Sequence, residues 1–344
     1  MKSGLPGLFV ILLFLSTVSG QGSVLNKTIV YIQNYSTWLD AQTFCRSSYS
    51  DLAVLYEQSD VDNMDLYQYF AWISLNKDGN NWGVKLDQNI WVNDYQPNQG
   101  CAVVNYQKQR LQGADCEQDY FFFCSASEDK YVFINESLTW SEAEARCKKP
   151  YGGLGVVKDK DHLNKATLRQ DFPVWTGLHR NGATWSWSAG LSDYRNWALN
   201  EPGNNGDCVA ISSVSKTMTT HNCSARYPFI CFMDNLLLVK ENRTWEEALE
   251  YCKKLNAQLV SVQPGDYTYI SDRAIEADTD EVWTGLRYLA GSWFWVNGAD
   301  ITLSDLPGCP LTELHCGAFS KNDPGRLEAR DCVEEKNFLC YSEG

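Results

Sequence analysis

The sequence predicts three tandem copies of one unit that combines a helix with several short β-strands. Three observations predict it: a helix motif that occurs three times, apolar strand patterns that follow each copy, and cysteines that repeat in one register. The motif is Thr-Trp-x-[Asp/Glu]-Ala-x3-Cys, at 37–45, 139–147 and 244–252. Its copies start 102 and then 105 residues apart, which is enough chain for each unit to bury a core with the help of disulfides.

The motif has the features of the first turns of a helix. The threonine can cap the helix by accepting a hydrogen bond from a free N–H group, and the acidic residue three positions later can complete a capping box. Tryptophan, alanine and cysteine then fall at i, i+3 and i+7, on one helical face. We therefore expect three helices that turn a tryptophan and a cysteine toward the core.

Strand patterns follow each helix. The first is a short apolar run, at 51–55, 153–157 and 258–262. The second contains a tryptophan and is also apolar, at 71–75, 174–178 and 282–286. A third has tryptophan at alternate positions, 185 and 187, then 293 and 295. Because large aromatic side chains at strand spacing fill the core of a small domain, we expect core positions for them rather than a ligand platform.

Thirteen cysteines indicate a disulfide framework and an oxidising compartment. Twelve follow a register of four per unit: Cys45, Cys101, Cys116 and Cys124; Cys147, Cys208, Cys223 and Cys231; Cys252, Cys316, Cys332 and Cys340. Four cysteines allow three pairings in each unit, and spacing alone does not choose among them. Cys309 is left over. We expect it to form an interchain disulfide that gives a covalent dimer, with a buried or capped thiol as the alternative.

Residues 1–20 predict a secretory signal peptide, with Lys2 before a short apolar run and small residues before a mature start at Gln21. The run is shorter than the ~20 residues that a bilayer requires, and no later stretch could span a membrane. We therefore expect a secreted, extracellular chain, with a truncated form of a membrane receptor as the alternative. Four N-glycosylation sequons agree with secretion, at Asn26, Asn34, Asn135 and Asn242.

The formal net charge of −14 argues against nucleic acid and other polyanionic partners, because such binding requires clustered Lys and Arg. Neutral sugars and proteins remain as partners. An enzyme is not expected, because the four histidines lack metal-ligand spacing and no nucleophile, phosphate-loop or zinc motif is present. The sequence therefore favours a binding protein.

The Trp-x6-Cys helix, the Trp-x-Gly-Leu strand, the Trp-x-Trp strand and the four-cysteine register together resemble the C-type lectin-like domain. The tandem arrangement resembles part of a macrophage mannose receptor-type array, although without a membrane anchor. The resemblance implies an α+β fold in which two helices pack on small antiparallel sheets and a long loop carries the ligand site. It implies three domains, at 26–125, 130–232 and 236–342.

The resemblance also implies a disulfide pairing of first with fourth and second with third cysteine in each domain. The implied bridges are Cys45–Cys124, Cys101–Cys116, Cys147–Cys231, Cys208–Cys223, Cys252–Cys340 and Cys316–Cys332.

Sugar-binding members hold calcium in the long loop through Glu-Pro-Asn or Gln-Pro-Asp, an acid before the second cysteine, and a later Trp-Asn-Asp. The second domain is the most similar to this pattern, with Glu-Pro-Gly-Asn-Asn-Gly-Asp at 201–207, but Met-Thr-Thr replaces Trp-Asn-Asp. Calcium takes about 6–8 oxygen ligands, and two carboxylates rarely suffice. We expect Glu201, Asn204, Asn205 and Asp207 to form at most a weak calcium site, and no other cofactor.

The other two loops depart further from the pattern. The first domain offers Gln96 and Asn98 without a carboxylate, and the third has Leu-Pro-Gly at 306–308. The prolines of the three loops, at 97, 202 and 307, are expected to follow cis peptide bonds, as in the family.

The resulting expectation is a secreted, non-catalytic C-type lectin-like recognition protein for glycans or glycoproteins, with degenerate calcium sites and a role in innate defence. The first alternative is a calcium-independent protein-binding module that uses the same loops, because fold alone does not fix function. The second is calcium-dependent glycan binding through the second domain.

Overall fold

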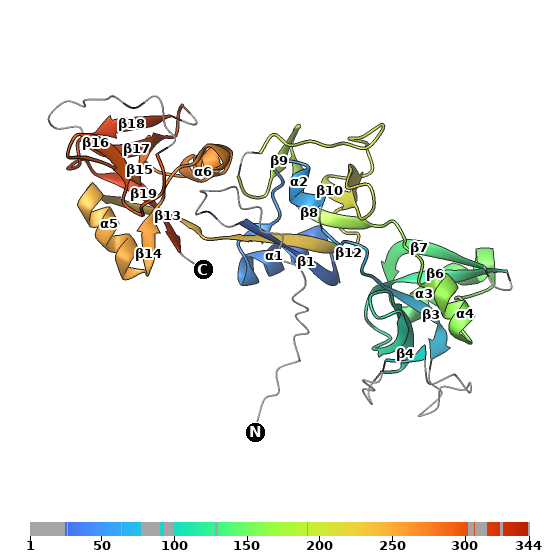
Figure 1. Ribbon diagram of the computed structural model, residues 1–344. Helices are drawn as coiled ribbons and strands as arrows, with labels where there is room; N and C mark the ends of the chain where they lie inside the picture. Colours follow the sequence, from blue (N-terminus) through green and yellow to red (C-terminus); the bar gives the residue numbers. More distant parts are fainter. Residues whose placement is uncertain are drawn as a thin grey trace, which may run out of the picture.

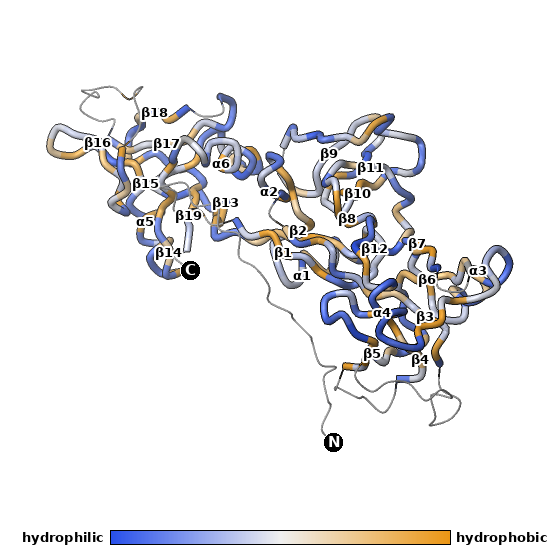
Figure 2. The backbone as a smooth tube through the Cα atoms, turned by 45° about the vertical axis from the view of Figure 1, so that its right-hand side comes forward, coloured by the Kyte–Doolittle hydropathy of each residue, from blue (hydrophilic) through white to orange (hydrophobic). Residues whose placement is uncertain are grey.

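A computed structural model describes residues 25, 27–62, 64–76, 90–92, 99–127, 130–190, 192–301, 306, 315–323 and 326–342. It shows three α+β units arranged in a row, each built around one mainly antiparallel sheet (Figure 1). This confirms the fold class that the sequence predicts. The hydrophobic segments gather along the strands of each unit, and the outer loops are mostly hydrophilic (Figure 2).

The third unit is formed by consecutive elements. They are β13 (Leu236–Arg243), α5 (Trp245–Lys254), β14 (Ala257–Leu259), a 3-10 turn (Pro264–Asp266), α6 (Tyr267–Ala274), β15 (Glu281–Leu289), β16 (Ser292–Trp295), β17 (Cys316–Ser320), β18 (Leu327–Arg330) and β19 (Lys336–Ser342). The sheet has the order β13-β19-β15-β17-β18, with β14 on β19 and β16 on β15. The first strand of this unit therefore pairs with its own last strand.

The first two units are not consecutive. The first segment consists of β1 (Lys27–Ser36), α1 (Trp38–Ser48), β2 (Asp51–Leu52) and α2 (Ser59–Asp62). A first body follows, with β3 (Phe70–Asn76), β4 (Cys101–Asn105), β5 (Arg110–Ala114) and β6 (Tyr120–Ser127). A second segment has β7 (Lys130–Leu138), α3 (Trp140–Tyr151) and α4 (Lys160–Ala166). A second body has β8 (Pro173–Asn181), β9 (Thr184–Trp187), β10 (Cys208–Ser212), β11 (Met218–His221) and β12 (Tyr227–Asp234).

The two segments are exchanged between the two bodies. The first segment lies on the second body, where β1 pairs antiparallel with β12 and Val30 lies opposite Cys231. The second segment lies on the first body, where β7 pairs with β6 and Val132 lies opposite Cys124. Figure 1 shows β1 and α1 beside β8 and β12, whereas β7 and α3 lie with β3 and β6. The expected ranges 26–125 and 130–232 thus describe repeats in the sequence, but each compact unit takes its segment from the other repeat.

The three helices of the repeated motif, α1, α3 and α5, begin where the sequence predicts. Each starts directly after a threonine, and capping boxes form at Thr139 with Glu142 and at Thr244 with Glu247. In the first copy the Asp40 N–H donates to the Thr37 hydroxyl oxygen at 3.2 Å. These local hydrogen bonds do not depend on the body on which the helix packs, so the motif forms a helix in the exchanged and in the closed units.

The same tryptophan contacts hold each segment to its body. In the closed third unit, Trp245 donates its indole N–H to the Thr284 carbonyl at 2.8 Å, and Trp283 donates back to the Arg243 carbonyl at 2.9 Å. The equivalent contacts of the exchanged units are Trp38 to Thr176, Trp175 to Ser36, Trp140 to Ile73 and Trp72 to Leu138. An exchanged segment therefore makes the contacts that a closed segment makes.

The disulfides follow the exchange, and two of the expected bridges are wrong. Cys45 pairs with Cys231, and Cys124 pairs with Cys147, in place of Cys45–Cys124 and Cys147–Cys231. The physical reason is that the first cysteine lies on the segment helix and bridges to whichever body receives that helix. The other four bridges form as expected: Cys101–Cys116, Cys208–Cys223, Cys252–Cys340 and Cys316–Cys332.

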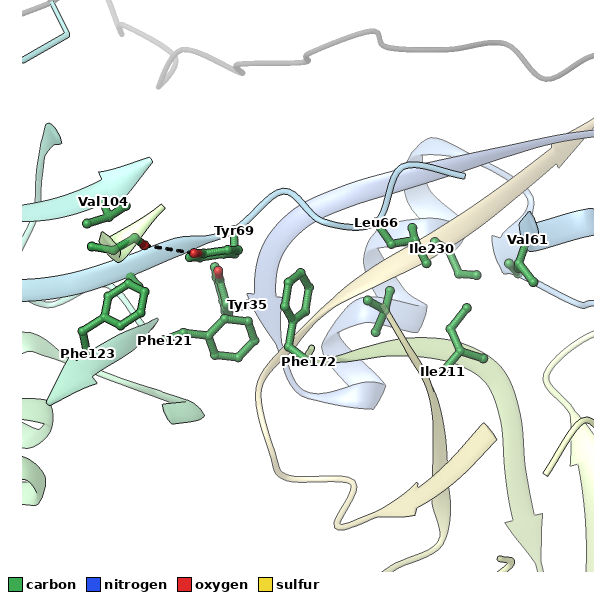
Figure 3. Close-up of a cluster of buried hydrophobic side chains, with 14 of the residues drawn as sticks. Tyr35, Val61, Leu66, Tyr69, Val104, Phe121, Phe123, Phe172, Ile211 and Ile230 are labelled. Carbon is green, nitrogen blue, oxygen red and sulfur yellow. Dashed lines mark hydrogen bonds between the residues drawn. The ribbon is translucent and has the colours of Figure 1, made fainter. Parts of the chain in front are cut away.

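One hydrophobic core runs through both exchanged units (Figure 3). Tyr35 of β1 lies with its ring centroid 4.7 Å from that of Phe121 of the first body, in an edge-to-face contact. Phe172, just before β8, lies 5.2 Å from Phe121. The Tyr69 hydroxyl donates to the Leu168 carbonyl at 2.8 Å, which joins the two connectors between segments and bodies. The third unit has separate core clusters.

Of the alternating tryptophans, Trp187 and Trp295 are buried, which confirms the core placement predicted for them. Trp185 and Trp293 are only half-buried, because they point to the other face of their strands. In the part of the chain that the structure describes, no helix has the length and apolar character needed to cross a membrane.

The exchange predicts the disulfide map of the native protein. Digestion without reduction, followed by mass spectrometry, is expected to give one peptide pair that joins Cys45 to Cys231 and another that joins Cys124 to Cys147. The bridges Cys101–Cys116 and Cys208–Cys223, which are the same in both arrangements, serve as internal controls. Recovery of Cys45–Cys124 as the main species would contradict the exchanged arrangement.

The shared core predicts that the first two units unfold together. Phe172→Ala is expected to remove about 3–5 kcal/mol of stability, because it empties a fully buried aromatic position. This loss should appear equally in probes placed in both exchanged units during chemical denaturation. Phe319→Ala in the third unit is the matched control and should leave that transition in place. Destabilisation of only one of the first two units by Phe172→Ala would show that they unfold independently.

Candidate functional site

The second unit presents a long loop between β9 and β10, and β11 supports it. The Ala198 N–H donates to the Met218 carbonyl at 2.9 Å, and the Met218 N–H donates to the Asn196 carbonyl at 2.7 Å. The peptide bond between Glu201 and Pro202 is cis, as expected. Pro97 and Pro307, for which the same expectation was made, lie outside the described residues.

Glu201 is held by hydrogen bonds from its own loop and from β11. Its Oε2 accepts from the Gly203 N–H at 2.6 Å, the Thr220 N–H at 3.1 Å and the Thr220 hydroxyl at 2.7 Å. Partial burial raises the pKa of Glu201, but these hydrogen bonds outweigh the burial and its pKa lies below the ordinary value. Glu201 therefore acts in this loop as an ionised carboxylate that fixes the loop to the strand.

Asp207 is paired with an arginine. The Arg180 Nε donates to Asp207 Oδ1 at 2.6 Å, and Nη2 contacts the same oxygen. The Arg180 N–H also donates to the Asp207 carbonyl at 2.7 Å. Arg180 stands at the end of β8, with its guanidinium 5.4 Å from the ring centroid of Trp185. The charge of Asp207 is thus balanced within the protein.

The four predicted ligands differ in their surroundings. Asn204 and Asn205 are exposed, and Glu201 and Asp207 make the separate contacts given above. Within the described ranges, the one group of three possible metal-binding side chains is Glu246 with Cys316 and Cys332, and these cysteines are joined in a disulfide. The residues present therefore do not fit a calcium ion, because Arg180 would have to give up Asp207 first.

The remaining predicted site residues are placed as follows. Gln96, Asn98, Asn26 and Cys309 lie outside the described residues. The sequons at Asn34, Asn135 and Asn242 are exposed on β1, β7 and β13, where a glycan can be accommodated. Their glycosylation stays a prediction.

Sequence reasoning missed an aromatic surface beside the loop. Trp185 and Trp197 are both half-buried, and their rings meet edge to face with centroids 5.4 Å apart. Leu199, two residues after Trp197, is 91% exposed. The sequence signal was available, because Trp185 belongs to the alternating pattern. However, only the tertiary structure brings Trp197 and Arg180 against its outward face.

His221 is half-buried beside the loop. Its ring packs against Trp175 and Tyr227, with centroids 5.9 and 5.2 Å apart, and its Nε2 lies 2.9 Å from the Thr219 hydroxyl. Gly206 passes so close that a Cβ there would lie 2.0 Å from the His221 carbonyl oxygen, so glycine is required. Burial lowers the pKa of His221, and the Glu201 carboxylate opposes this in part.

The burial of His221 predicts a loss of stability in acid. Because the pKa is below 6.5 in the folded chain, the unfolded chain takes up the proton first as the pH falls. Chemical denaturation should therefore show a stability that decreases from pH 7.5 to pH 5.5. His221→Gln, which cannot titrate, should show a smaller decrease over the same range. An equal decrease in both proteins would assign the effect to other groups.

Comparison with known proteins identifies the family to which this architecture belongs. The family model for the lectin C-type domain matches residues 34–126, 136–233 and 241–342. The secretory phospholipase A2 receptor of Oryctolagus cuniculus is 23% identical over 256 residues, which are 60% of this chain and 18% of the receptor. Lithostathine-1 of Mus musculus is 34% identical over 115 residues, which are 29% of this chain and 70% of that protein.

A crystal structure of human lithostathine is 21% identical, with a TM-score of 0.29, and the match covers 32% of this chain and 83% of that one. The chain spans less than a fifth of the phospholipase A2 receptor. The family model, in contrast, matches most of the chain, and it does so once for each helix motif. This protein therefore belongs to the C-type lectin domain family and carries three tandem copies of its domain.

Proposed function

We propose that this chain is a secreted recognition protein that binds glycans or glycoproteins through the long loop of its second unit, without a requirement for calcium. The observation that carries the proposal is the ion pair between Arg180 and Asp207 beside the half-exposed Trp185. The family membership supports lectin-like recognition, and its relatives named above are receptors and lithostathines rather than enzymes.

The chemistry of the loop suits a neutral, hydroxyl-bearing ligand. An arginine offers five N–H donors in a fixed plane and has no acceptor, and Asp207 orients this plane. The faces of Trp185 and Trp197 supply apolar area next to these donors. A cation of the protein thus stands beside the acid that a calcium site would need, so a sugar would meet guanidinium donors in place of a metal ion.

A protein ligand is the second candidate. Tryptophan and arginine are enriched among the residues that dominate protein–protein binding energy. Leu199 supports this alternative, because its fully exposed apolar side chain extends the surface beyond the two tryptophans. The net charge of −14 disfavours nucleic acid for either candidate.

Secretion, a role in innate defence and a covalent dimer complete the proposal. The six disulfides use twelve of the thirteen cysteines, so no other cysteine of the chain remains for Cys309. This supports an interchain bridge through Cys309, which a non-reducing gel tests directly: a band only at monomer mass would exclude it. A dimer would also strengthen weak loop contacts through avidity.

Binding to a glycan array, with millimolar calcium and again with chelator, tests the function. We expect binding that survives chelation and that falls by about tenfold or more in Arg180→Ala and in Trp185→Ala. Arg146→Ala is the matched control, because it breaks another exposed ion pair, with Glu136 on the second segment, far from the loop in sequence.

Each other outcome decides against part of the proposal. Binding that needs calcium would restore the calcium-dependent alternative. Unchanged binding in both loop variants would place the site elsewhere in the chain. If the chain binds no glycan in either condition, the protein-ligand candidate is favoured. Binding to a protein that free sugar does not displace would support that candidate.

A further inference from the structure

The stem of the long loop in the second unit contacts the first segment. Tyr194 and Asn196 lie on this stem, between β9 and the motif at 201–207. The Tyr194 hydroxyl donates to Oε1 of Gln58 at 2.5 Å, and Nδ2 of Asn196 donates to the same oxygen at 2.6 Å. Gln58 directly precedes α2 and belongs to the first segment. One amide oxygen of the first segment thus accepts two hydrogen bonds from the loop.

The orientation of the Gln58 amide is fixed by α2. Its Nε2 donates to Oδ1 of Asp62 at 2.8 Å, and an ionised carboxylate only accepts hydrogen bonds. The amide nitrogen therefore faces α2, and the amide oxygen faces the loop. Tyr194 and Asn196 are both half-buried, so removal of this oxygen would leave two donors of the loop without their acceptor, which is destabilising.

The backbone around Asn196 connects this contact to the recognition surface. The Met218 N–H of β11 donates to the Asn196 carbonyl at 2.7 Å, and the Ala198 N–H donates to the Met218 carbonyl at 2.9 Å. Trp197 lies between these two hydrogen bonds, and its ring contacts Trp185. Asn196 is therefore bound by the first segment through its side chain and by β11 through its backbone, and the place of Trp197 depends on both.

A second hydrogen bond joins the stem to the first segment. Ser192 is buried, and its hydroxyl donates to the Leu55 carbonyl at 2.5 Å and accepts from the Tyr194 N–H at 3.1 Å. On the other side of the stem, Nη2 of Arg195 donates to the Trp185 carbonyl at 3.0 Å. The stem thus lies between the first segment and the second body, and both supply hydrogen-bond partners.

The closed third unit uses a glutamine of its own segment in a similar way. Gln263 lies between β14 and α6, and its Nε2 donates to the Asp300 carbonyl at 3.2 Å, on the long loop that follows β16. A glutamine that precedes the second helix of a segment therefore contacts the loop stem in an exchanged unit and in the closed unit.

In the second unit, this glutamine comes from the other repeat. Leu52 and Leu154 each pair with the last cysteine of the body that receives them, so the two segments align with an offset of 154 − 52 = 102. At this offset Lys160 holds the position of Gln58, and a lysine ammonium group has no acceptor atom. The acceptor for the loop of the second repeat is therefore a residue of the first repeat.

We propose that Gln58 is a positioning residue for the recognition surface of the second unit, so that this surface is built jointly by the first and second repeats. The amide oxygen of Gln58 fixes Asn196 and, through it, the backbone at Trp197 against β11. The inference rests on the proposed function for the identity of the surface, whereas the contact of Gln58 with the loop does not depend on a ligand.

Hydrogen exchange of the full chain, followed by mass spectrometry, tests the proposal without a ligand. Gln58→Met removes the oxygen and keeps a side chain of similar length. We expect the amide hydrogens of Ala198 and Met218 to exchange at least about fivefold faster, because the loop stem opens locally more often. Peptides from β10 report opening of the whole unit and should exchange as in the wild type.

Two further variants separate the acceptor from other effects of the change. Gln58→Glu combined with Asp62→Asn reverses donor and acceptor at α2 and keeps an oxygen toward the loop, so this double variant should restore slow exchange. Gln118→Met is the matched control, because it makes the same change at an exposed glutamine of the first body and should leave the loop unchanged.

Glycan-array binding of the same variants, with chelator present, measures the consequence for recognition. Gln58→Met should lower the affinity by about fivefold or more, because the free surface then spends less time in the binding conformation. The double variant of Gln58→Glu with Asp62→Asn should recover the affinity, and Gln118→Met should bind as the wild type does.

Unchanged exchange at Ala198 and Met218 in Gln58→Met would overturn the proposal. Exchange that rises equally in β10 would also overturn it, because Gln58 would then support the whole unit rather than the loop. The same holds if Gln58→Met binds glycan like a wild type that does bind. A wild type that binds no glycan would reject the proposed function alone, and the exchange rates would still decide whether Gln58 positions the loop.

Discussion

The fold depends on one constraint: each sheet body must receive a strand-and-helix segment whose carbonyl accepts a hydrogen bond from the indole N–H of the body's buried tryptophan. Trp72, Trp175 and Trp283 are fully buried, and each donates its indole N–H to a carbonyl just before a segment helix. An unpaired buried donor costs about 1–3 kcal/mol, so a body without a segment is incomplete. The cysteine two turns along that helix then joins segment to body covalently. The constraint specifies that a segment is present, but it does not specify which one.

This freedom explains why exchange is possible and what it changes. Two bodies and two segments of equal fit can be combined in two ways, and the protein adopts the reciprocal one. The result is a common core in which Tyr35 of the first segment and Phe172, just before the second body, both pack against Phe121 of the first body. The ion pair of Arg273 with the buried Asp234 carboxylate then extends this assembly to the third unit. The long loop of the second unit therefore belongs to a body that contacts both the first and the third unit.

In the long loop of the second unit, both carboxylates of the calcium-type motif are held by groups of the protein. Glu201 retains its position and its charge, but three hydrogen-bond donors from Gly203 and Thr220 surround one of its oxygens. Asp207 retains its charge as well, and Arg180 neutralises it. Both carboxylates thus stabilise the loop conformation. In the proposed function, the neighbouring tryptophans provide the binding surface.

The sequence by itself determined the features that rest on local interactions. Thr37, Thr139 and Thr244 begin helices because capping is local, and the cysteine register identified all twelve bridged cysteines because every unit repeats it. Only the tertiary structure decided which segment joins which body, since Val30 and Val132 each lie opposite the last cysteine of the body that receives them. It also decided the state of the site, because Arg180 and Asp207 are 27 residues apart and nothing local to either predicts their pairing. The helix starts follow from residues that are neighbours in the sequence. The pairing of segments with bodies and of Arg180 with Asp207 depends on contacts between residues that are distant in the sequence.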